Sequence, residues 1–168
     1  MKKQFLILFL IFWGSSLAQS SYPPQSGNSN DKNQVNDKNQ VKEEMRKIYV
    51  SYLNSEGYRP EIDKDGDVVF KIEGKSYFIT AYNPDFFKMS RYLDIEKEGC
   101  TDRLQKVLNE FHWSRLDAKA MTSNACTWIE VRCSSLLANP EDWEKIFKET
   151  SISLNYAVQS FWELYYEE

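Results

Sequence analysis

The sequence predicts an α+β fold in which an antiparallel sheet of about five strands packs against helices, in the order helix, three strands, helix, two strands, helix. Two observations predict it. Apolar and polar residues alternate within residues 68–95 and again within 115–134, as they do in half-buried strands. Three other segments repeat apolar residues every three or four positions, which is the period of a helix with one buried face.

The first helix is predicted over roughly residues 40–56. Gly57 follows it, and a glycine at this position commonly ends a helix in the left-handed conformation. Four apolar residues at spacings of four, three and four are expected on its buried face: Val41, Met45, Ile48 and Tyr52.

Three strands are predicted between residues 68 and 95, separated by turns at Glu73-Gly74-Lys75 and Asn83-Pro84-Asp85. An earlier turn is expected at Asp65-Gly66. The alternate residues that should share one face are Val68, Phe70 and Ile72, then Tyr77, Ile79 and Ala81, then Phe87, Met89, Arg91, Leu93 and Ile95.

The second half of the domain is predicted as helix, two strands and helix. The helix at 101–113 has Thr101 as its cap and an apolar stripe of Leu104, Val107, Leu108 and Phe111. The strands at about 115–122 and 126–134 should direct Leu116, Ala118 and Ala120, then Ile129, Val131 and Cys133, inward. Asn139 and Pro140 suit the start of a closing helix whose stripe is Trp143, Phe147, Thr150, Leu154, Val158, Phe161 and Tyr165.

The N-terminus has the features of a secretory signal peptide. Lys2 and Lys3 precede an apolar run over residues 5–13, which is too short to cross a bilayer, and small residues flank a cleavage site after Ala18. We therefore expect a periplasmic or extracellular protein with no stable membrane anchor after cleavage.

Residues 19–40 are polar, and we expect them to form a disordered tether before a single domain at 41–168. Within the tether, Asn30–Val35 (NDKNQV) is repeated at once as Asn36–Val41. Removal of residues 1–18 leaves 19 basic and 25 acidic side chains, a net charge of −6. Because the basic residues are also scattered, nucleic acid is not expected as a partner.

No catalytic or cofactor-binding set is recognisable in the sequence. His112 is the single histidine and lies beside an apolar helix stripe, so we expect a boundary residue with a polar partner. The alternative is a ligand or a base, for example one that activates Cys100. There is no Gly-x-Ser-x-Gly elbow and no phosphate-binding loop. We expect a protein that is not an enzyme and takes no cofactor.

An acidic cluster gives the one candidate metal site. Glu61, Asp63, Asp65 and Gly66 match the first, third, fifth and sixth positions of a calcium-binding EF-hand loop, but the twelfth position is Ile72 where that loop needs a glutamate. We therefore expect a tight turn and no metal.

Three cysteines leave at least one thiol unpaired. Cys126 and Cys133 lie seven residues apart in the predicted last strand and so face opposite ways, which prevents a bond between them. Cys133 is expected as a small buried hydrophobe. Cys100 with Cys126 is the pair that could form a disulfide, and the sequence does not decide whether it does.

Four residues of the closing helix lie off its main apolar stripe: Trp162, Tyr166, Ile152 and Tyr156. Two interpretations are open. They are either the rims of a deeply buried helix or a partner interface, where Trp and Tyr commonly contribute most of the binding energy.

From about residue 43 onwards the chain resembles the YbjN family, whose fold is similar to that of type III secretion chaperones. The resemblance rests on YLNSEGY (52–58), DKDGDVVFKIEGKSYFI (63–79), LQKVLNEF (104–111) and the long closing helix. It implies a sheet with packed helices that often pairs into dimers, and a role in binding partner proteins or in regulation. We therefore expect an exported binding module that acts on a protein partner or on a second copy of itself. The alternative is a small-ligand or glycan binder that uses exposed aromatic residues, including Trp113 and Trp128.

Overall fold

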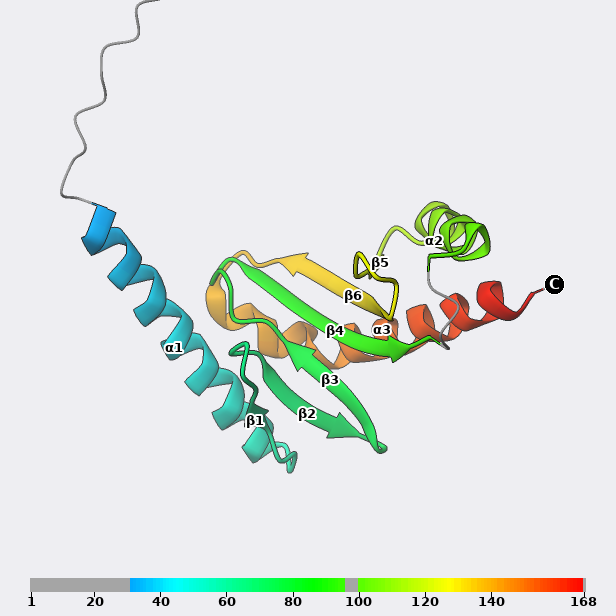
Figure 1. Ribbon diagram of the computed structural model, residues 1–168. Helices are drawn as coiled ribbons and strands as arrows, with labels where there is room; N and C mark the ends of the chain where they lie inside the picture. The colour runs from blue at the N-terminus through cyan, green and yellow to red at the C-terminus, as the bar shows by residue number, and fades with distance from the viewer. Residues whose placement is uncertain (1–30, 96–99, 168) are drawn as a thin grey trace, which may run out of the picture.

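The computed structural model describes the backbone of residues 31–95 and 100–167, and the side chains of residues 39–95 and 100–167. These residues form one six-stranded sheet and three α-helices (Figure 1). The elements are α1 (Asp31–Ser55), β1 (Glu61–Ile62), β2 (Val68–Ile72), β3 (Lys75–Ile79), β4 (Phe86–Asp94), α2 (Asp102–Ser114), β5 (Ala118–Thr122), β6 (Trp128–Leu136), the 3₁₀ turn η1 (Pro140–Asp142) and α3 (Trp143–Tyr166).

The sheet is antiparallel throughout, in the order β1-β2-β3-β4-β6-β5. This confirms the predicted α+β class and element order. The prediction of about five strands missed β1, which pairs Glu61 and Ile62 with β2. Two residues are too few to show the alternation by which a strand is predicted from sequence.

The core lies between α3 and one face of the sheet, because much of α3 runs behind the strands (Figure 1). Trp143, at the start of α3, is at the centre of an aromatic cluster that includes Tyr49 of α1, at 4.6 Å between ring centroids, and Phe87 of β4, at 5.8 Å. The predicted stripe of α3 is buried from Trp143 to Phe161, and Tyr165 is half-buried. The opposite face of the sheet is not covered by any described helix (Figure 1).

The buried face of α1 differs from the predicted one. Met45, Tyr49 and Leu53 face the core, whereas Val41 and Ile48 are exposed, Ile48 to 50%. At about 100° per residue the true face is rotated by roughly 70° from the predicted one. Apolar residues occur around most of this helix, so the spacing alone could not choose between two adjacent stripes.

Helix α1 begins at Asp31, so the prediction of a disordered tether was wrong for residues 31–40. No glycine or proline occurs between residues 31 and 55, and a helix that is stabilised by packing at its C-terminal end can therefore extend through the repeat. The predicted signal peptide and the rest of the predicted tether fall in residues 1–30, outside the described residues. Within the described part of the chain, no helix is both long and apolar enough to cross a membrane.

The strands of the second half begin later than predicted. Leu116 was expected to face inward but is 95% exposed, because β5 begins only at Ala118, after a turn in which Arg115 pairs with Asp117. Cys126 was expected in the last strand but precedes β6, in a turn closed by the Cys126 N–H donating to Ser123 O. The inward residues Ala118, Ala120, Ile129, Val131 and Cys133 are buried as predicted.

The predicted helix signals are present. Thr101 caps α2 by accepting from the Leu104 N–H, and the four stripe residues of α2 are buried. Gly57 has a φ of +86° just after α1, and the next N–H, of Tyr58, donates to Leu53 O. Asn139 and Pro140 open η1, a short 3₁₀ turn that leads directly into α3.

Candidate functional site

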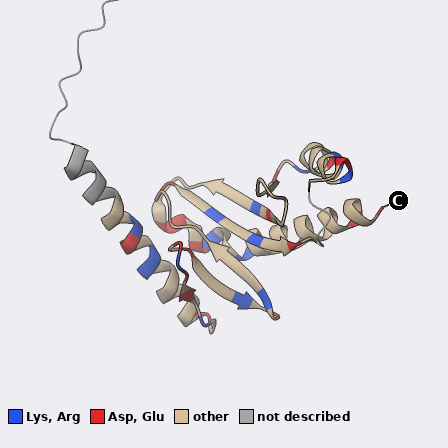
Figure 2. Ribbon diagram, viewed as in Figure 1, with Lys and Arg blue, Asp and Glu red and all other residues tan. Residues whose placement is uncertain are grey.

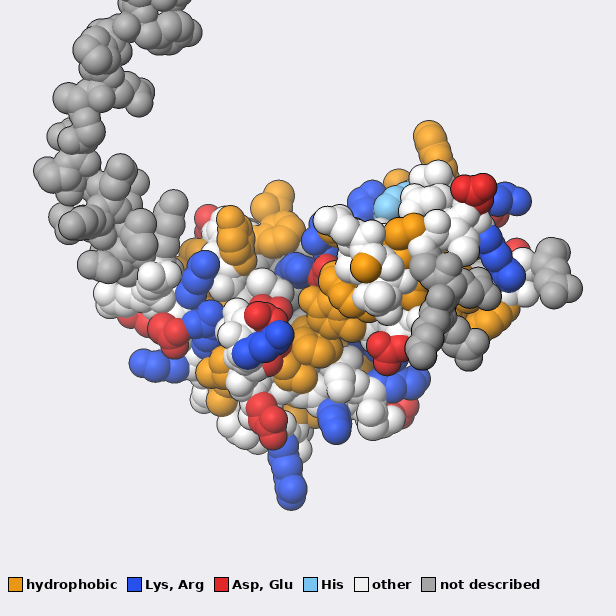
Figure 3. All heavy atoms as spheres, in the orientation of Figure 1, with side chains coloured by type: hydrophobic (Ala, Val, Ile, Leu, Met, Phe, Trp, Pro, Cys, Tyr) orange, Lys and Arg blue, Asp and Glu red, His pale blue; other side chains and the backbone are white. Residues whose placement is uncertain are grey.

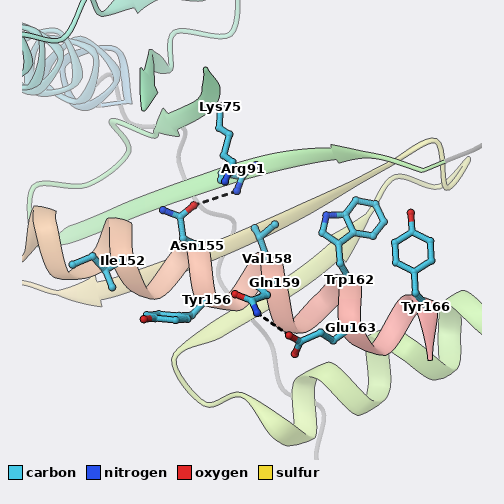
Figure 4. Close-up of a pocket in the computed structure, with 10 residues that line it drawn as sticks. All are labelled: Lys75, Arg91, Ile152, Asn155, Tyr156, Val158, Gln159, Trp162, Glu163 and Tyr166. Atoms are coloured by element: carbon cyan, nitrogen blue, oxygen red, sulfur yellow. Dashed lines mark hydrogen bonds between the residues drawn. The ribbon is translucent and has the colours of Figure 1, made fainter. Parts of the chain in front are cut away.

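A groove of about 780 Å³ lies along α3, where the C-terminal half of the helix faces strands β3 and β4. Helix α3 forms one wall and supplies eight residues, while the other wall holds two basic residues from the sheet (Figure 4). The lining residues are Lys75, Arg91, Ile152, Asn155, Tyr156, Val158, Gln159, Trp162, Glu163 and Tyr166.

All four residues predicted as a partner interface line this groove. Ile152, Tyr156 and Tyr166 are exposed, to 47%, 61% and 68% respectively. Trp162 is half-buried and stacks on Tyr166 at 5.5 Å between ring centroids. Trp162 therefore lies at the rim of the core and also forms part of the wall of the groove.

The residues that form the sheet wall of the groove were not predicted from the sequence as site residues. Arg91 lies on the core-facing side of β4, where its guanidinium is 5.4 Å from the centroid of the Tyr77 ring. Its Nη1 donates to Asn155 Oδ1 at 3.3 Å, and the Tyr77 hydroxyl donates to the same oxygen at 2.5 Å. Burial raises the pKa of Tyr77, with the nearby Arg91 charge acting in the opposite direction, so the phenol stays a neutral donor.

One sequence signal could have found Arg91. It is the only basic residue at an inward position of the alternating run in β4, and a cation at such a position needs a partner or a cavity. Lys75, the first residue of β3, is on the same face because residues Lys75 and Tyr77 are two apart in one strand. At the other end of the groove, Gln159 Nε2 donates to Glu163 Oε1 at 2.8 Å.

A disulfide joins Cys100 and Cys126, the pair that the sequence had left open. Cys133 is the free cysteine and is buried, as predicted. Burial raises the pKa of its thiol to about 11, so the thiolate is disfavoured and the residue is a poor nucleophile.

His112 has the polar partner that was predicted. Its Nε2 lies 2.7 Å from Ala120 O and 3.2 Å from Ala120 N, which links α2 to β5. Cys100, the other member of the considered pair, is held in the disulfide. The ring thus contacts the backbone of the neighbouring strand.

The acidic cluster forms the turn between β1 and β2. Asp63 Oδ1 accepts from the N–H groups of Asp65 and Asp67, at 2.9 Å each, and Gly66 has a φ of +84°. The Arg46 side chain donates to Gly66 O at 2.6 Å. The predicted turn is present at Asp65-Gly66, and one carboxylate of the cluster holds the loop.

The open face of the sheet carries a row of three aromatic side chains. Tyr92 is 4.8 Å from Phe78 and 5.3 Å from Trp128 between ring centroids, and hydrophobic atoms gather over the middle of this face (Figure 3). Beside the row, Lys88 Nζ pairs with Glu130 Oε1 at 2.8 Å. Burial, followed by the charge of Glu130, raises the pKa of Tyr92 to about 12. Trp113, by contrast, stands alone on α2 and is 89% exposed.

Comparison with known proteins supports the fold. No protein-family model matches this chain, and no curated protein does. The crystal structure of YbjN from E. coli superimposes with a TM-score of 0.51 at 14% sequence identity, over 67% of this chain and 86% of YbjN. At that identity the likeness concerns architecture, and it agrees with the resemblance found in the sequence. The chain has a YbjN-like α+β fold.

Proposed function

We propose that this protein is an exported binding module without catalytic activity. The groove along α3 binds a protein partner, which is either a different protein or a second copy of this chain. The observation that carries the proposal is the groove itself, which brings Ile152, Tyr156, Trp162 and Tyr166 together on one exposed surface. A YbjN-like fold supports a binding or regulatory role of this kind.

The shape and composition of the groove favour a protein segment over a small molecule. It is open along the helix and not enclosed, and its apolar surface comes mainly from large side chains. Small molecules usually bind in pockets that bury most of their surface. Tyr and Trp are enriched among the residues that dominate protein interfaces, and three of the four groove residues that were predicted as an interface are of these types.

Export is supported by two features that lie far apart in the chain. The basic and apolar pattern of residues 2–18 is typical of a secretory signal peptide. The Cys100–Cys126 disulfide suits an oxidising compartment, because cytosolic thiols are generally kept reduced. Both support a periplasmic or extracellular location.

A photo-crosslinking experiment tests the proposal in the native cell. A benzophenone amino acid replaces Tyr156 in the groove or, as the matched control, Tyr82, which is 72% exposed and outside the groove. We expect a discrete protein adduct from position 156 and none from position 82. An adduct of twice the chain mass indicates a homodimer. The absence of any adduct from position 156, or identical adducts from both positions, contradicts the proposal.

A second candidate function is glycan binding by the open face of the sheet. The row Phe78–Tyr92–Trp128 favours it, because neighbouring rings that are at least partly exposed offer apolar contact to a sugar chain. The test is a glycan array probed with the full mature chain and with Trp128→Ala. Binding that the substitution abolishes supports this function, whereas no glycan binding by the unchanged protein removes it.

A further inference from the structure

The groove along α3 contains two positive charges that no described acidic residue neutralises. Arg91 and Lys75 both reach it from the sheet wall, and neither forms an ion pair with another residue among those described. Glu163, the acidic lining residue, bonds to Gln159 at the opposite end. The groove is therefore electrically asymmetric, with its cations at the sheet wall (Figure 4).

Arg91 is held in one orientation by neutral groups. The Tyr77 ring stacks on it and Asn155 accepts one of its N–H groups, but neither carries a negative charge. Its Nε is buried, with no acceptor among the described residues. A guanidinium has five N–H donors, and its fork matches a carboxylate. Because the side chain is already ordered, binding a carboxylate there loses little side-chain entropy.

The helix wall sets the length and the apolar character of what can bind. Ile152 and Tyr166 are fourteen residues apart in α3, which corresponds to about 21 Å along the axis. An extended peptide covers that distance with about six residues. The wall between them offers Tyr156 and Trp162 to large apolar side chains.

These features favour an acidic peptide over other anions. A nucleic acid or a sulfated polymer needs a stripe of many cations, whereas this groove has two, with Glu163 at one end. Figure 2 shows that basic residues near the β2–β3 turn are few, and that Lys and Arg are interspersed with Asp and Glu over the described chain. One or two carboxylates beside large apolar groups match the number and the kind of groups that line the groove.

We propose that the groove binds an extended acidic segment of a partner protein, in which a carboxylate pairs with Arg91 and Lys75 and neighbouring large apolar side chains pack on Tyr156 and Trp162. This inference rests on the proposed function and adds the chemistry of the partner. Only the segment that enters the groove needs to be acidic, whatever the charge of the whole partner.

The probe is a displayed library of random heptapeptides selected against the full mature chain. We expect the selected peptides to be enriched in Asp or Glu together with Trp, Phe, Tyr or Leu. Selection of neutral or basic peptides that still need Tyr156 overturns the acidic inference and leaves the proposed function intact. Failure to select any peptide that Tyr156→Ala weakens, in a chain that also does not self-associate through Tyr156, overturns both.

Charge reversal on one hairpin supplies the matched control. Lys75 and Lys71 are both exposed, but Lys71 pairs with Ser76 and so lies on the opposite face of the sheet from Lys75, which pairs with Ile72. We expect Lys75→Glu to weaken the selected acidic peptides at least about tenfold, while Lys71→Glu leaves them within about twofold. Equal effects of the two substitutions overturn the inference.

The variants also separate a second copy of the chain from a foreign segment. Sedimentation of the mature chain is measured with and without a selected peptide. Self-association that Tyr156→Ala abolishes, together with no enrichment of acidic peptides, identifies a second copy as the occupant and overturns the acidic inference. We expect the peptide to bind the chain one to one, and Arg91→Lys to retain part of that binding because it keeps the charge and loses the fork.

Discussion

Cys100 and Cys126 are joined by a disulfide that links the residue before the cap of α2 to the turn before β6. The two cysteines are 26 positions apart in the sequence, and the loop that the bond closes contains the whole of α2 and β5. The disulfide therefore connects α2, which packs on β5 at the edge of the sheet, to β6, which pairs with the whole length of β4.

Removing the disulfide should lower stability. We expect Cys100→Ser with Cys126→Ser to reduce the free energy of unfolding by about 3 to 4 kcal/mol, the amount expected from releasing a loop of this length. Denaturant unfolding with and without dithiothreitol measures it. The double variant should be insensitive to the reductant, and a wild-type midpoint that reductant does not move contradicts the prediction.

Asp63 should act as a turn residue and not as a calcium ligand. Because its Oδ1 accepts two backbone N–H groups, Asp63→Ala is expected to cost about 1 kcal/mol, while Asp63→Asn, which keeps that oxygen, should cost much less. Thermal unfolding with and without millimolar calcium tests this. A calcium-induced rise in the wild-type midpoint that both variants lose would restore the metal interpretation.

Cys133 should make the fold less stable at alkaline pH. Burial raises its pKa from the ordinary 9.0 to about 11, so between these values the unfolded chain loses the thiol proton while the native chain keeps it. Stability therefore falls as pH rises through this window, by at most about 1.4 kcal/mol per pH unit. Unfolding at pH 8 and pH 10 should show a steeper loss in the wild type than in Cys133→Ala, and equal slopes would exclude the effect. Because both proteins contain the same tyrosines, the contribution of tyrosine ionisation to the pH dependence cancels in the comparison.

Alanine substitutions of Trp162 and Tyr166 should affect the stability of the domain and its partner binding to different extents. Tyr166 is exposed, so Tyr166→Ala should change the free energy of unfolding by less than about 0.5 kcal/mol, whereas Trp162→Ala should cost about 2 kcal/mol. The double substitution should still fold and should weaken partner binding by about 2 kcal/mol or more. Denaturant melts and crosslinking from position 156 measure the two effects. Lost stability with undiminished crosslinking would mean that both residues serve only the core.

Most of the fold could be predicted from the sequence because its elements carry strong periodic patterns. The stripe of α3 and the alternation in β2 to β4 each come from many residues that repeat one spacing. The start of α1 and of β5 could not be predicted with the same accuracy, since helix ends and strand starts depend on packing that only the folded chain provides. Leu116 shows this, because it continues the alternation but lies before the strand.

One wall of the candidate site could be predicted from the sequence, and the other could not. Its helix wall follows from a helical wheel, since Ile152, Tyr156, Trp162 and Tyr166 lie off the buried stripe. Its sheet wall needs the pairing of β3 with β4 and the path of α3 across them, which bring Lys75 and Arg91 to residues more than sixty positions away in the chain. Such long-range neighbours leave no local spacing to recognise.

The projection of α1 beyond the sheet fixes where the preceding chain meets the domain (Figure 1). Among the described side chains of α1 the first buried one is Met45, fourteen residues after Asp31, which corresponds to about 21 Å along the helix axis. Because the helix is continuous, the packing of its C-terminal half on the core also fixes the direction of its N-terminal half. Because α1 is one continuous helix that packs on the core, the groove has a fixed position and orientation relative to residue 31.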